Sequence, residues 1–440
     1  MPIPEERRIS AEPTKEFFIS MLVKDIELPR AIIDLVDNSL DGARRIRPEG
    51  DFEGLFIRVE ASPKYFKITD NCGGIPVEMA RKYAFRFGRP QEMKPTPHSV
   101  GQFGVGMKRA LFKLGKAFSV ESTTRRSRFV VSEDVEVWKN KKEWEYELKE
   151  LEEGLNVPSD RTGTTIIVKP LHLSIAAEFE LESFQTRLAN QIAEAHAESM
   201  GRGLGITLGK LPLKFRPLDL LQSDRLGPAY QEMSFGTGRS RVEVKIYAGI
   251  SESKPSEAGW YIFCNGRLVL GADQSLTTGW GEGGEQTIPK YHNQYARFRG
   301  YAVFDSDDAS KLPWKTTKTG VDADSPSFRA VRLKMITLMR PVIDFLNRLD
   351  AEKDREAGDP KPLAAAVNQA KPVVLEDVRS RPTFLAPKPL VVPRGPEMGR
   401  IQYSKPLEQI KRVRRQLKAK SYKEIGEKTF EYYLKMECSD

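Results

Sequence analysis

Cysteine and histidine are scarce in this chain of 440 residues. Cys72, Cys264 and Cys438 are odd in number and far apart, so no disulfide framework is expected and a reducing cytoplasm is the expected location. The four histidines are equally scattered, and none stands at a zinc-binding spacing from a cysteine. The sequence therefore predicts neither a disulfide-linked protein nor a zinc protein.

Long apolar runs are absent as well. No segment approaches the roughly 18 uncharged apolar residues of a membrane span, and the N-terminal MPIPEERRIS lacks the apolar core of a signal peptide. Hydrophobic residues make up 39% and charged residues 30% of the chain, as in folded soluble domains. We therefore expect no membrane association, and the length predicts two or three domains.

Positive charge gathers near the C-terminus. The formal net charge is +9, and residues 351–440 hold 19 Lys and Arg against 13 Asp and Glu. Any contact with nucleic acid should therefore be sought in this tail first.

Apolar periodicity indicates a mixed helix-and-strand region over residues 1–172. Residues 28–47 place apolar side chains at spacings of three and four, which predicts an amphipathic helix. Residues 55–60 and 64–69 predict two strands joined at a Ser-Pro turn. A second helix is expected over residues 107–116.

The rest of the chain divides into three further parts. Residues 173–350 open with a helical stretch, continue with strands and close with a long amphipathic helix, which favours a separate α/β domain. Residues 351–403 are rich in proline and poor in periodic apolar residues, so we expect a linker there. Residues 404–440 predict a small basic module of two helices.

The segment DLVDN places a carboxylate and an amide one helical turn apart. Asp34 and Asn38 share a helix face because they stand at positions i and i+4. Such a pair can orient a water molecule and complete a Mg²⁺ coordination shell. An ordinary polar helix face is the simpler interpretation of this segment alone.

Two glycine-rich segments follow. In ITDNCGGIP a strand runs into Asp70, whose carboxylate can accept a hydrogen bond from an exocyclic amine such as that of adenine, although a plain turn has the same pattern. In GQFGVGMKRA the glycines Gly101, Gly104 and Gly106 lead into a helix, where backbone N–H groups and Lys108 can hold a phosphate. This segment is neither a Walker A loop nor a dinucleotide fingerprint.

A fourth segment, RTGTTII, brings Thr164 and Thr165 into a strand. Their hydroxyls are placed to hydrogen-bond Asp70 or a nucleobase. The alternative is that β-branched residues stand there only because they favour a strand.

In this order and at these separations, the four segments resemble the GHKL ATPase superfamily, which includes gyrase-type topoisomerases, heat-shock chaperones, histidine kinases, MutL and MORC proteins. The resemblance covers about residues 15–170. It implies an α+β fold in which a Bergerat-type ATP-binding α/β sandwich precedes an α/β transducer domain, with ATP and Mg²⁺ as cofactors. MutL and MORC-like proteins are the most similar in organisation.

The resemblance also implies a role for each motif residue. Asp34 would be the general base, Asn38 the Mg²⁺ ligand and Asp70 the adenine ligand, with residues 77–100 as a mobile lid. The nucleotide would further contact Gly74, Gly101, Gly104, Val105, Gly106, Lys108, Thr164 and Thr165.

The chain departs from the family pattern at two positions. The family's base is usually Glu, whereas Asp34 is one methylene shorter, and the first glycine of the D-x-G-x-G turn is Cys72. A shorter base positions its water less well, so slow hydrolysis is expected, which suits a switch.

A fifth segment, KLPWKTTKTGVD, is similar to the part of the transducer domain that supplies a γ-phosphate lysine in dimerising members. Lys318 is the first candidate and Lys315 the second. Such a lysine neutralises charge during phosphoryl transfer and senses the γ-phosphate. A solvated basic loop is the alternative. Histidine kinases lack this domain, which argues against that branch.

The tail segment 411–423 holds seven basic residues and no acidic one. On a helix Lys411, Arg412, Arg415 and Lys418 would lie close to one side and contact the phosphates of duplex DNA. A solvated helix or a docking surface for a protein partner explains the pattern equally well.

The combined hypothesis is a Mg²⁺-dependent ATP-binding and hydrolysing switch that forms a homodimer on ATP binding. It would act in a DNA transaction or an anti-phage defence assembly, with an effector protein as partner. The alternatives are a chaperone-like or signalling ATPase that remodels a protein, and a nucleotide-sensing scaffold with little turnover.

Overall fold

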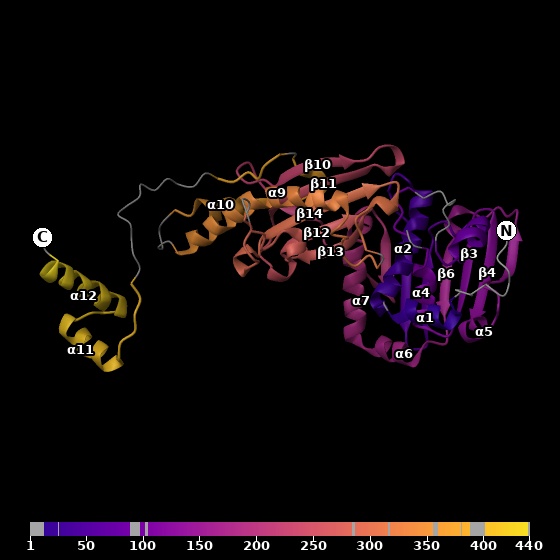
Figure 1. Ribbon diagram of the computed structural model, residues 1–440, viewed down its shortest axis with the longest axis horizontal. Coiled ribbons are helices and arrows are strands. Elements are labelled where there is room, and N and C mark those ends of the chain that lie inside the picture. The colour runs from indigo at the N-terminus through magenta and orange to yellow at the C-terminus, as the bar shows by residue number, and fades with distance from the viewer. Residues whose placement is uncertain are drawn as a thin grey trace, which may run out of the picture. The chain divides into compact units, whose positions relative to one another are not determined.

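The computed structural model describes residues 13–24, 26–88, 97–101, 104–283, 287–315, 317–354, 360–379, 381–387 and 401–438. The chain divides into two compact units, Met1–Lys388 and Pro389–Asp440. The first unit contains two β-sheets with helices packed on them, and the second contains two helices (Figure 1). The predicted α+β fold class is therefore confirmed.

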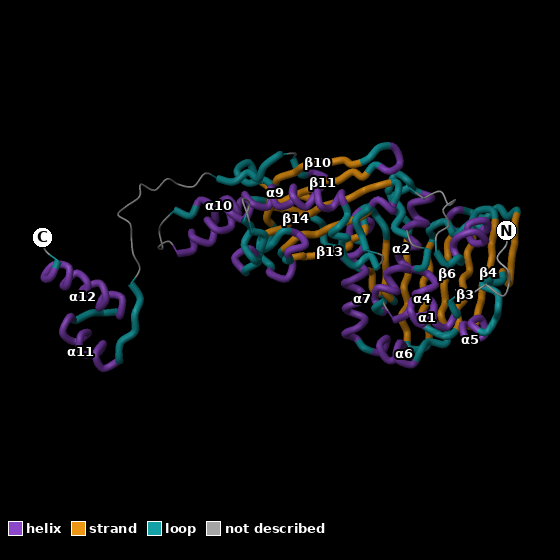
Figure 2. Tube along the Cα trace, in the orientation of Figure 1, coloured by secondary structure: helices purple, strands orange, loops and turns teal. Residues whose placement is uncertain are grey.

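The first sheet has eight strands in the order β5-β4-β3-β6-β2-β1-β7-β8. Its neighbours are antiparallel except for β1 and β7, which are parallel. The strands are β1 Phe56–Ser62, β2 Tyr65–Asp70, β3 Ala117–Thr123, β4 Ser127–Asp134, β5 Leu148–Glu153, β6 Gly163–Val168, β7 Gly205–Leu208 and β8 Leu211–Pro212. Helices α1, α2 and α4 pack together beside this sheet, as Figure 2 shows.

The helices of this part of the chain are mostly short. They are α1 Lys15–Lys24, α2 Leu28–Ile46, α3 Val77–Met79, α4 Gly106–Leu114, α5 Val135–Lys139, α6 Leu173–Glu180, α7 Glu182–Ala195 and α8 Ala197–Gly201. Among the described residues, no helix has both the length and the apolar character needed to cross a bilayer.

Helix α2 is the element around which the site is built. Pro29 stands in its first turn, where a missing N–H costs nothing, and Arg44 and Arg45 stand in its last turn, where positive charge favours the helix dipole. Its apolar side chains are buried except for Ile46 at the C-terminal end, and Asp34 and Asp37 are buried as well. These two carboxylates therefore face protein and not solvent.

The second sheet has five strands in the order β10-β11-β14-β12-β13. The strands are β10 Ala229–Phe235, β11 Val242–Ile250, β12 Gly259–Cys264, β13 Arg267–Asp273 and β14 Phe298–Ser306. The long helix α9, Pro326–Ala351, packs on one face of this sheet. Tyr247 and Tyr301 of the sheet pack with Leu220 and Leu375 in a second, smaller core.

Long-range strand pairing changes two predicted boundaries. Strands β7 and β8 follow residue 172 but join the first sheet, so that sheet continues past the predicted end of the first domain. Strand β9, Asp219–Gln222, pairs with β15, Lys371–Val374, inside the predicted linker.

The predicted linker also contains helix α10, Pro362–Gln369. Its Leu363 and Val367 are buried, as are Leu375 and Phe384 farther along. The described residues 360–379 and Phe384 therefore belong to the folded part of the first unit, although composition predicts a linker there. A few apolar side chains suffice for this packing, because they fit a surface that the second sheet and α9 supply.

The second unit consists of α11, Leu407–Leu417, and α12, Tyr422–Glu437. The helices contact each other, and within residues 401–438 Ala419 is the one buried residue. Lys411, Arg412, Arg415 and Lys418 are all exposed. Lys418 follows the end of α11 in the left-handed conformation, at φ +50°, so it does not continue the helix as predicted.

Candidate functional site

One pocket brings the four glycine- and carboxylate-bearing segments together. It lies where α2, the end of β2, β6 and the start of α4 meet, and the loop before α9 reaches it from the second sheet. The predicted residues that line it are Asp34, Asn38, Asp70, Gly74, Gly101, Gly104, Val105, Gly106, Lys108, Thr164 and Lys318.

Asp70 lines the pocket and is held by three donors. Ser39 Oγ donates to Asp70 Oδ2 at 2.6 Å, and the backbone N–H of Cys72 donates to Oδ1 at 2.9 Å. The N–H of Thr164 donates to the same Oδ1 at 3.1 Å. Burial raises the pKa of Asp70, and these hydrogen bonds oppose the rise. A fixed acceptor beside an apolar wall is the arrangement that orients a planar amine-bearing ring.

The wall beside Asp70 is formed by Ile68 and Ile166, which stand on neighbouring strands and line the pocket. Two glycines keep the backbone close enough for this packing. A Cβ at Gly163 would strike the carbonyl oxygen of Asp70, and one at Gly74 would strike that of Thr123. Gly74 also has a φ of +70°, a conformation that favours glycine.

Cys72 occupies the position where glycine was expected, and Gly42 of α2 makes room for it. A Cβ at Gly42 would lie 2.7 Å from the Cys72 carbonyl oxygen and 3.2 Å from its Cβ. Cys72 is buried, and burial raises the pKa of its thiol well above the ordinary value. The thiol is therefore protonated and packs as a small apolar group.

Of the two predicted threonines, only Thr164 faces the pocket. Its hydroxyl lies 3.0 Å from Ser122 Oγ, so it reaches Asp70 through its N–H and not through the predicted hydroxyl. Thr165 donates to Thr69 Oγ1 at 3.3 Å and does not line the pocket. Because successive strand side chains point to opposite faces, the Thr165 hydroxyl lies on the face away from the pocket that Thr164 lines.

The segment 97–101, which we call the glycine loop, is fixed to α2 by Asp41. Val100 N–H donates to Asp41 Oδ1 and Gly101 N–H donates to Asp41 Oδ2, both at 2.7 Å. A Cβ at Gly101 would lie 2.7 Å from Asp41 Oδ2, so glycine is needed for this approach. Residues 89–96 of the predicted lid lie outside the described residues.

Lys108 stands in the first turn of α4 and is buried. Its Nζ donates to the carbonyl oxygens of Gly104 at 2.5 Å and Ala84 at 2.9 Å. Burial lowers the pKa of Lys108 to about 7. Its amine therefore titrates in the physiological range, close to helix N–H groups suited to an anion.

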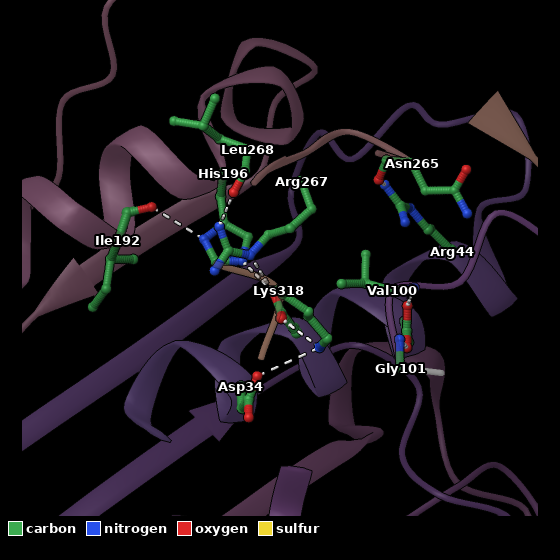
Figure 3. Close-up of polar contacts among 12 residues, drawn as sticks. Asp34, Arg44, Val100, Gly101, Ile192, His196, Asn265, Arg267, Leu268 and Lys318 are labelled. Carbon is green, nitrogen blue, oxygen red and sulfur yellow. Dashed lines mark hydrogen bonds and ion pairs between the residues drawn. The ribbon is translucent and has the colours of Figure 1, made fainter. Parts of the chain in front are cut away.

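Asp34 also lines the pocket and lies between two cations. Arg109 Nη2 donates to Asp34 Oδ2 at 2.6 Å, and Lys318 Nζ lies 3.5 Å from Asp34 Oδ1. All three side chains are buried. Figure 3 shows Lys318 reaching from its loop toward Asp34. Lys315 is exposed and does not line the pocket, so of the two candidate lysines Lys318 is the one the fold brings there.

Asn38 is the amide predicted to hold a metal. Its side chain lines the pocket, and its Nδ2 is buried without a hydrogen-bond partner among the described residues. A buried N–H donor that lacks a partner is rare, and it suits a ligand that brings a hydrogen-bond acceptor. A cation would bind the amide oxygen instead, so the metal role of Asn38 stays a prediction.

The side chains that line the site suit Mg²⁺, which needs few protein ligands. They do not suit a metal that is held by protein side chains alone. Within the described ranges, no group of three or more His, Cys, Asp and Glu side chains is arranged to hold a metal. Mg²⁺ usually takes one or two protein oxygens and completes its shell with phosphate oxygens and water. An amide oxygen from Asn38 is therefore sufficient on the protein side.

Sequence reasoning missed five residues of this site. Asp37 and Asp41 flank Asn38 in the same helix, and Arg109 follows Lys108, so all three were within reach of the motif argument. His196 precedes α8 and Arg267 begins β13, and both contact Asp37, which is far away in the sequence. The residues next to them in the sequence therefore do not indicate this contact.

The comparison with protein families matches residues 26–164 to the family described as histidine kinase-, DNA gyrase B-, and HSP90-like ATPase. This span contains the first three motif segments and the fourth as far as Thr164. Lys318 lies outside it. No curated protein is significantly similar to the chain. The motifs, the pocket that they line and the matched span agree, and the chain therefore carries an ATP-binding domain of the GHKL ATPase superfamily.

Proposed function

We propose that this protein is a slow, Mg²⁺-dependent ATPase that works as a molecular switch. The observation that carries the proposal is that one pocket contains both an acceptor for a nucleobase and a group of side chains suited to phosphates and Mg²⁺. Asp70 offers a fixed acceptor on the pocket wall, and Asp34, Asn38 and Lys318 line the same pocket. In this proposal Asp70 meets the adenine, and the other three meet the triphosphate of the same nucleotide.

Each residue has a defined task in this proposal. Asp70 accepts a hydrogen bond from the adenine amine, while Lys108 and the N–H groups at the start of α4 bind phosphate oxygens. Asn38 holds Mg²⁺, which neutralises phosphate charge when bound. Asp34 takes a proton from the attacking water, and Lys318 stabilises the charge that develops on the γ-phosphate.

The ion pair between Asp34 and Arg109 explains why turnover should be slow. Arg109 bonds one oxygen of Asp34 and Lys318 approaches the other, so an attacking water must compete with two cations for the carboxylate. The pair is buried and 2.6 Å long, so solvent does not screen it. The same observation favours the second candidate, a nucleotide-sensing scaffold with little turnover.

The output of the switch is proposed to be a homodimer that engages duplex DNA or a protein effector, in a DNA transaction or a defence assembly. MutL and MORC-like proteins remain the branches proposed to be most similar. Support for DNA comes from exposed basic side chains on and after α11, and support for a protein partner comes from exposed aromatics on α12. A chaperone-like role is the alternative output.

The test combines calorimetry with phosphate-release kinetics on the whole chain. ATP with Mg²⁺ should bind the wild-type protein, and Asn38→Ala should lose the part of the affinity that depends on Mg²⁺. Asp34→Asn should lower the rate of phosphate release about 100-fold or more while ATP affinity changes less than about threefold, since general-base catalysis contributes roughly 10²–10⁴ in rate.

Asn140→Ala is the matched control, because Asn140 is an exposed amide that bonds only its own helix. Absence of any ATP-binding heat from folded wild-type protein would reject the proposal. Binding with an unchanged rate in Asp34→Asn would select the scaffold instead of the ATPase.

A further inference from the structure

A buried cluster of ionisable side chains adjoins the pocket. Asp37, His196, Arg267 and Lys318 are exposed by only 0, 0, 2 and 6%. They come from α2, from the residue between α7 and α8, from β13 and from the loop before α9 (Figure 3). The cluster therefore joins the ATP-binding domain to the second sheet.

Both oxygens of Asp37 are occupied within this cluster. Oδ2 accepts a hydrogen bond from Lys318 Nζ at 2.8 Å. Oδ1 accepts one from Arg267 Nε at 3.0 Å and lies 2.9 Å from His196 Nε2. Asp37 thus contacts one residue that lines the pocket and two that do not.

The two partners on Oδ1 are themselves fixed by backbone carbonyls. Arg267 Nη1 donates to the oxygen of Leu268 at 2.6 Å, and His196 Nδ1 lies 3.0 Å from the oxygen of Ile192. Figure 3 shows His196 and Arg267 beside Ile192 and Leu268, with these contacts as dashed lines. Asp37 is therefore held by two groups that are themselves hydrogen-bonded to the backbone.

Charge keeps this arrangement intact. Burial raises the pKa of Asp37, but Lys318, Arg267 and His196 outweigh it and hold that pKa well below the ordinary value. Burial lowers the pKa of Lys318, and Asp37 followed by Asp34 outweighs this. Both groups of the pair are therefore ionised.

The loop holds the backbone of Lys318 but not its ammonium group. Lys318 has a φ of +54°, its N–H donates to the Lys315 carbonyl oxygen at 2.8 Å, and Lys315 N–H donates to the Gly320 carbonyl oxygen at 3.2 Å. These bonds fix the turn, and the end of the long side chain is placed by its own contacts. The described contacts of the Lys318 ammonium are Asp37 at 2.8 Å and Asp34 at 3.5 Å. Asp37 is the closer of the two.

We infer that Asp37 is a positioning residue that holds the Lys318 ammonium beside Asp34, and that His196 and Arg267 hold Asp37 for this purpose. Asp37 does not line the pocket, so it acts through Lys318 and not on the nucleotide. The inference rests on the proposed function, because Lys318 is taken there as the γ-phosphate lysine. It adds that Asp37, which lies outside the pocket, helps the protein to distinguish ATP from ADP by holding Lys318 in place.

The experiment is a double-mutant cycle read out by binding. Calorimetry with Mg²⁺ gives the Kd of ADP divided by the Kd of ATP for wild type, Asp37→Asn, Lys318→Met and the double variant. Each single variant should lower this ratio about tenfold, and the double variant should lower it no further, because coupled residues are not additive. A purely structural defect would weaken ADP and ATP equally and leave the ratio unchanged.

Glu352→Gln is the matched control. Glu352 is a buried carboxylate that accepts hydrogen bonds from Leu363 N–H and Ala364 N–H at the start of α10, and it does not line the pocket. This variant should lower the melting temperature without changing the ratio. Thermal unfolding of every variant identifies loss of folding.

His196→Gln keeps the inference testable if Asp37→Asn does not fold. It should lower the ratio about threefold in the wild-type chain and not at all when Lys318 is already Met. Additive effects, or an unchanged ratio in Asp37→Asn and His196→Gln, would overturn the inference while ATP binding stands. No ATP binding by the wild-type chain would instead remove the proposed function beneath it.

Discussion

At the scale of single residues, Lys108 combines burial with proximity to the predicted phosphate site. Its amine faces two carbonyl oxygens and no carboxylate among the contacts described. Burial therefore lowers its pKa to about 7 without an opposing ion pair. A phosphate brought to this position would favour the charged form and raise that pKa again.

ATP binding should accordingly take up a proton at Lys108. At pH 8 the free amine, with a pKa of about 7, is mostly neutral, and a bound triphosphate makes it ammonium. Calorimetry at pH 8 in buffers of different ionisation enthalpy should report an uptake approaching one proton per ATP, and Lys108→Met should abolish most of it. Equal uptake by the two proteins would show that Lys108 does not contact phosphate.

The pocket residues that sequence could predict are those whose spacing within one motif already limits their chemistry. Asp34 and Asn38 share a helix face, and Asp70 ends a strand beside glycines, so their convergence follows from local geometry. Thr165 is adjacent to Thr164 in the sequence, but strand alternation separates their hydroxyls. His196 meets Asp37 only through tertiary packing, and nothing near His196 in the sequence indicates it.

At the scale of elements, the segment 97–101 connects α2 to the second sheet. Arg44 of α2 donates to the carbonyl oxygens of His98 and Asn265. His98 in turn contacts Asp305 at 2.8 Å and Asp307 at 3.3 Å. The glycine loop is therefore held from both sides, by Asp41 of α2 and by carboxylates at the end of β14.

The contact between His98 and Asp305 should make this loop sensitive to pH. The hydrogen bond to Asp305 raises the pKa of His98, and partial burial opposes this. The stabilisation is fully present below the unfolded pKa of about 6.5 and is lost as the pH rises through the folded value.

Hydrogen–deuterium exchange, corrected for intrinsic rates, should therefore show faster exchange of the Val100 and Gly101 amides at pH 8.5 than at pH 6. His98→Ala should exchange at the faster rate at both pH values. His172→Ala is the control, because His172 contacts the Phe112 carbonyl oxygen and no carboxylate in the described contacts. A pH effect that persists in His98→Ala would contradict the assignment.

Helix α2 shows how far sequence predicts an element, and β15 shows where this stops. The spacing of apolar residues predicted a helix over 28–47, and the helix spans Leu28–Ile46. Strand β15 has only four residues, and its existence depends on pairing with β9 about 150 positions earlier. The sequence around β15 is rich in proline, so its composition alone predicts a linker.

At the scale of the whole molecule, the two compact units differ in how much they bury. The first contains nearly all of the buried side chains of the described residues, including both hydrophobic clusters. The second leaves Phe430, Tyr432 and Tyr433 exposed beside many basic side chains. Such aromatic exposure on a small helical unit is typical of a surface that binds a partner.

The proposed switch predicts that nucleotide state controls assembly. Light scattering should give about 49.8 kDa with ADP and about twice that mass with a non-hydrolysable ATP analogue and Mg²⁺. Lys318→Met should remain at the smaller mass with either nucleotide.

Adding duplex DNA at low salt should raise the mass further if the basic tail binds phosphates, and a chain that lacks residues 401–440 should not respond. An equal mass with both nucleotides would rule out ATP-driven dimerisation. A response to DNA that survives removal of the tail would assign the contact to another surface.

The pairing of β9 with β15 has a practical consequence for anyone who shortens this protein. A version that stops at residue 350, near the end of α9, would lack β15, the strand that pairs with β9. It would also lack Leu375, which packs with Leu220 and Tyr247, so these side chains would become exposed. An open strand edge beside bare apolar side chains invites aggregation. Loss of solubility on such trimming would then reflect a damaged fold, and a cut beyond residue 387 would avoid it.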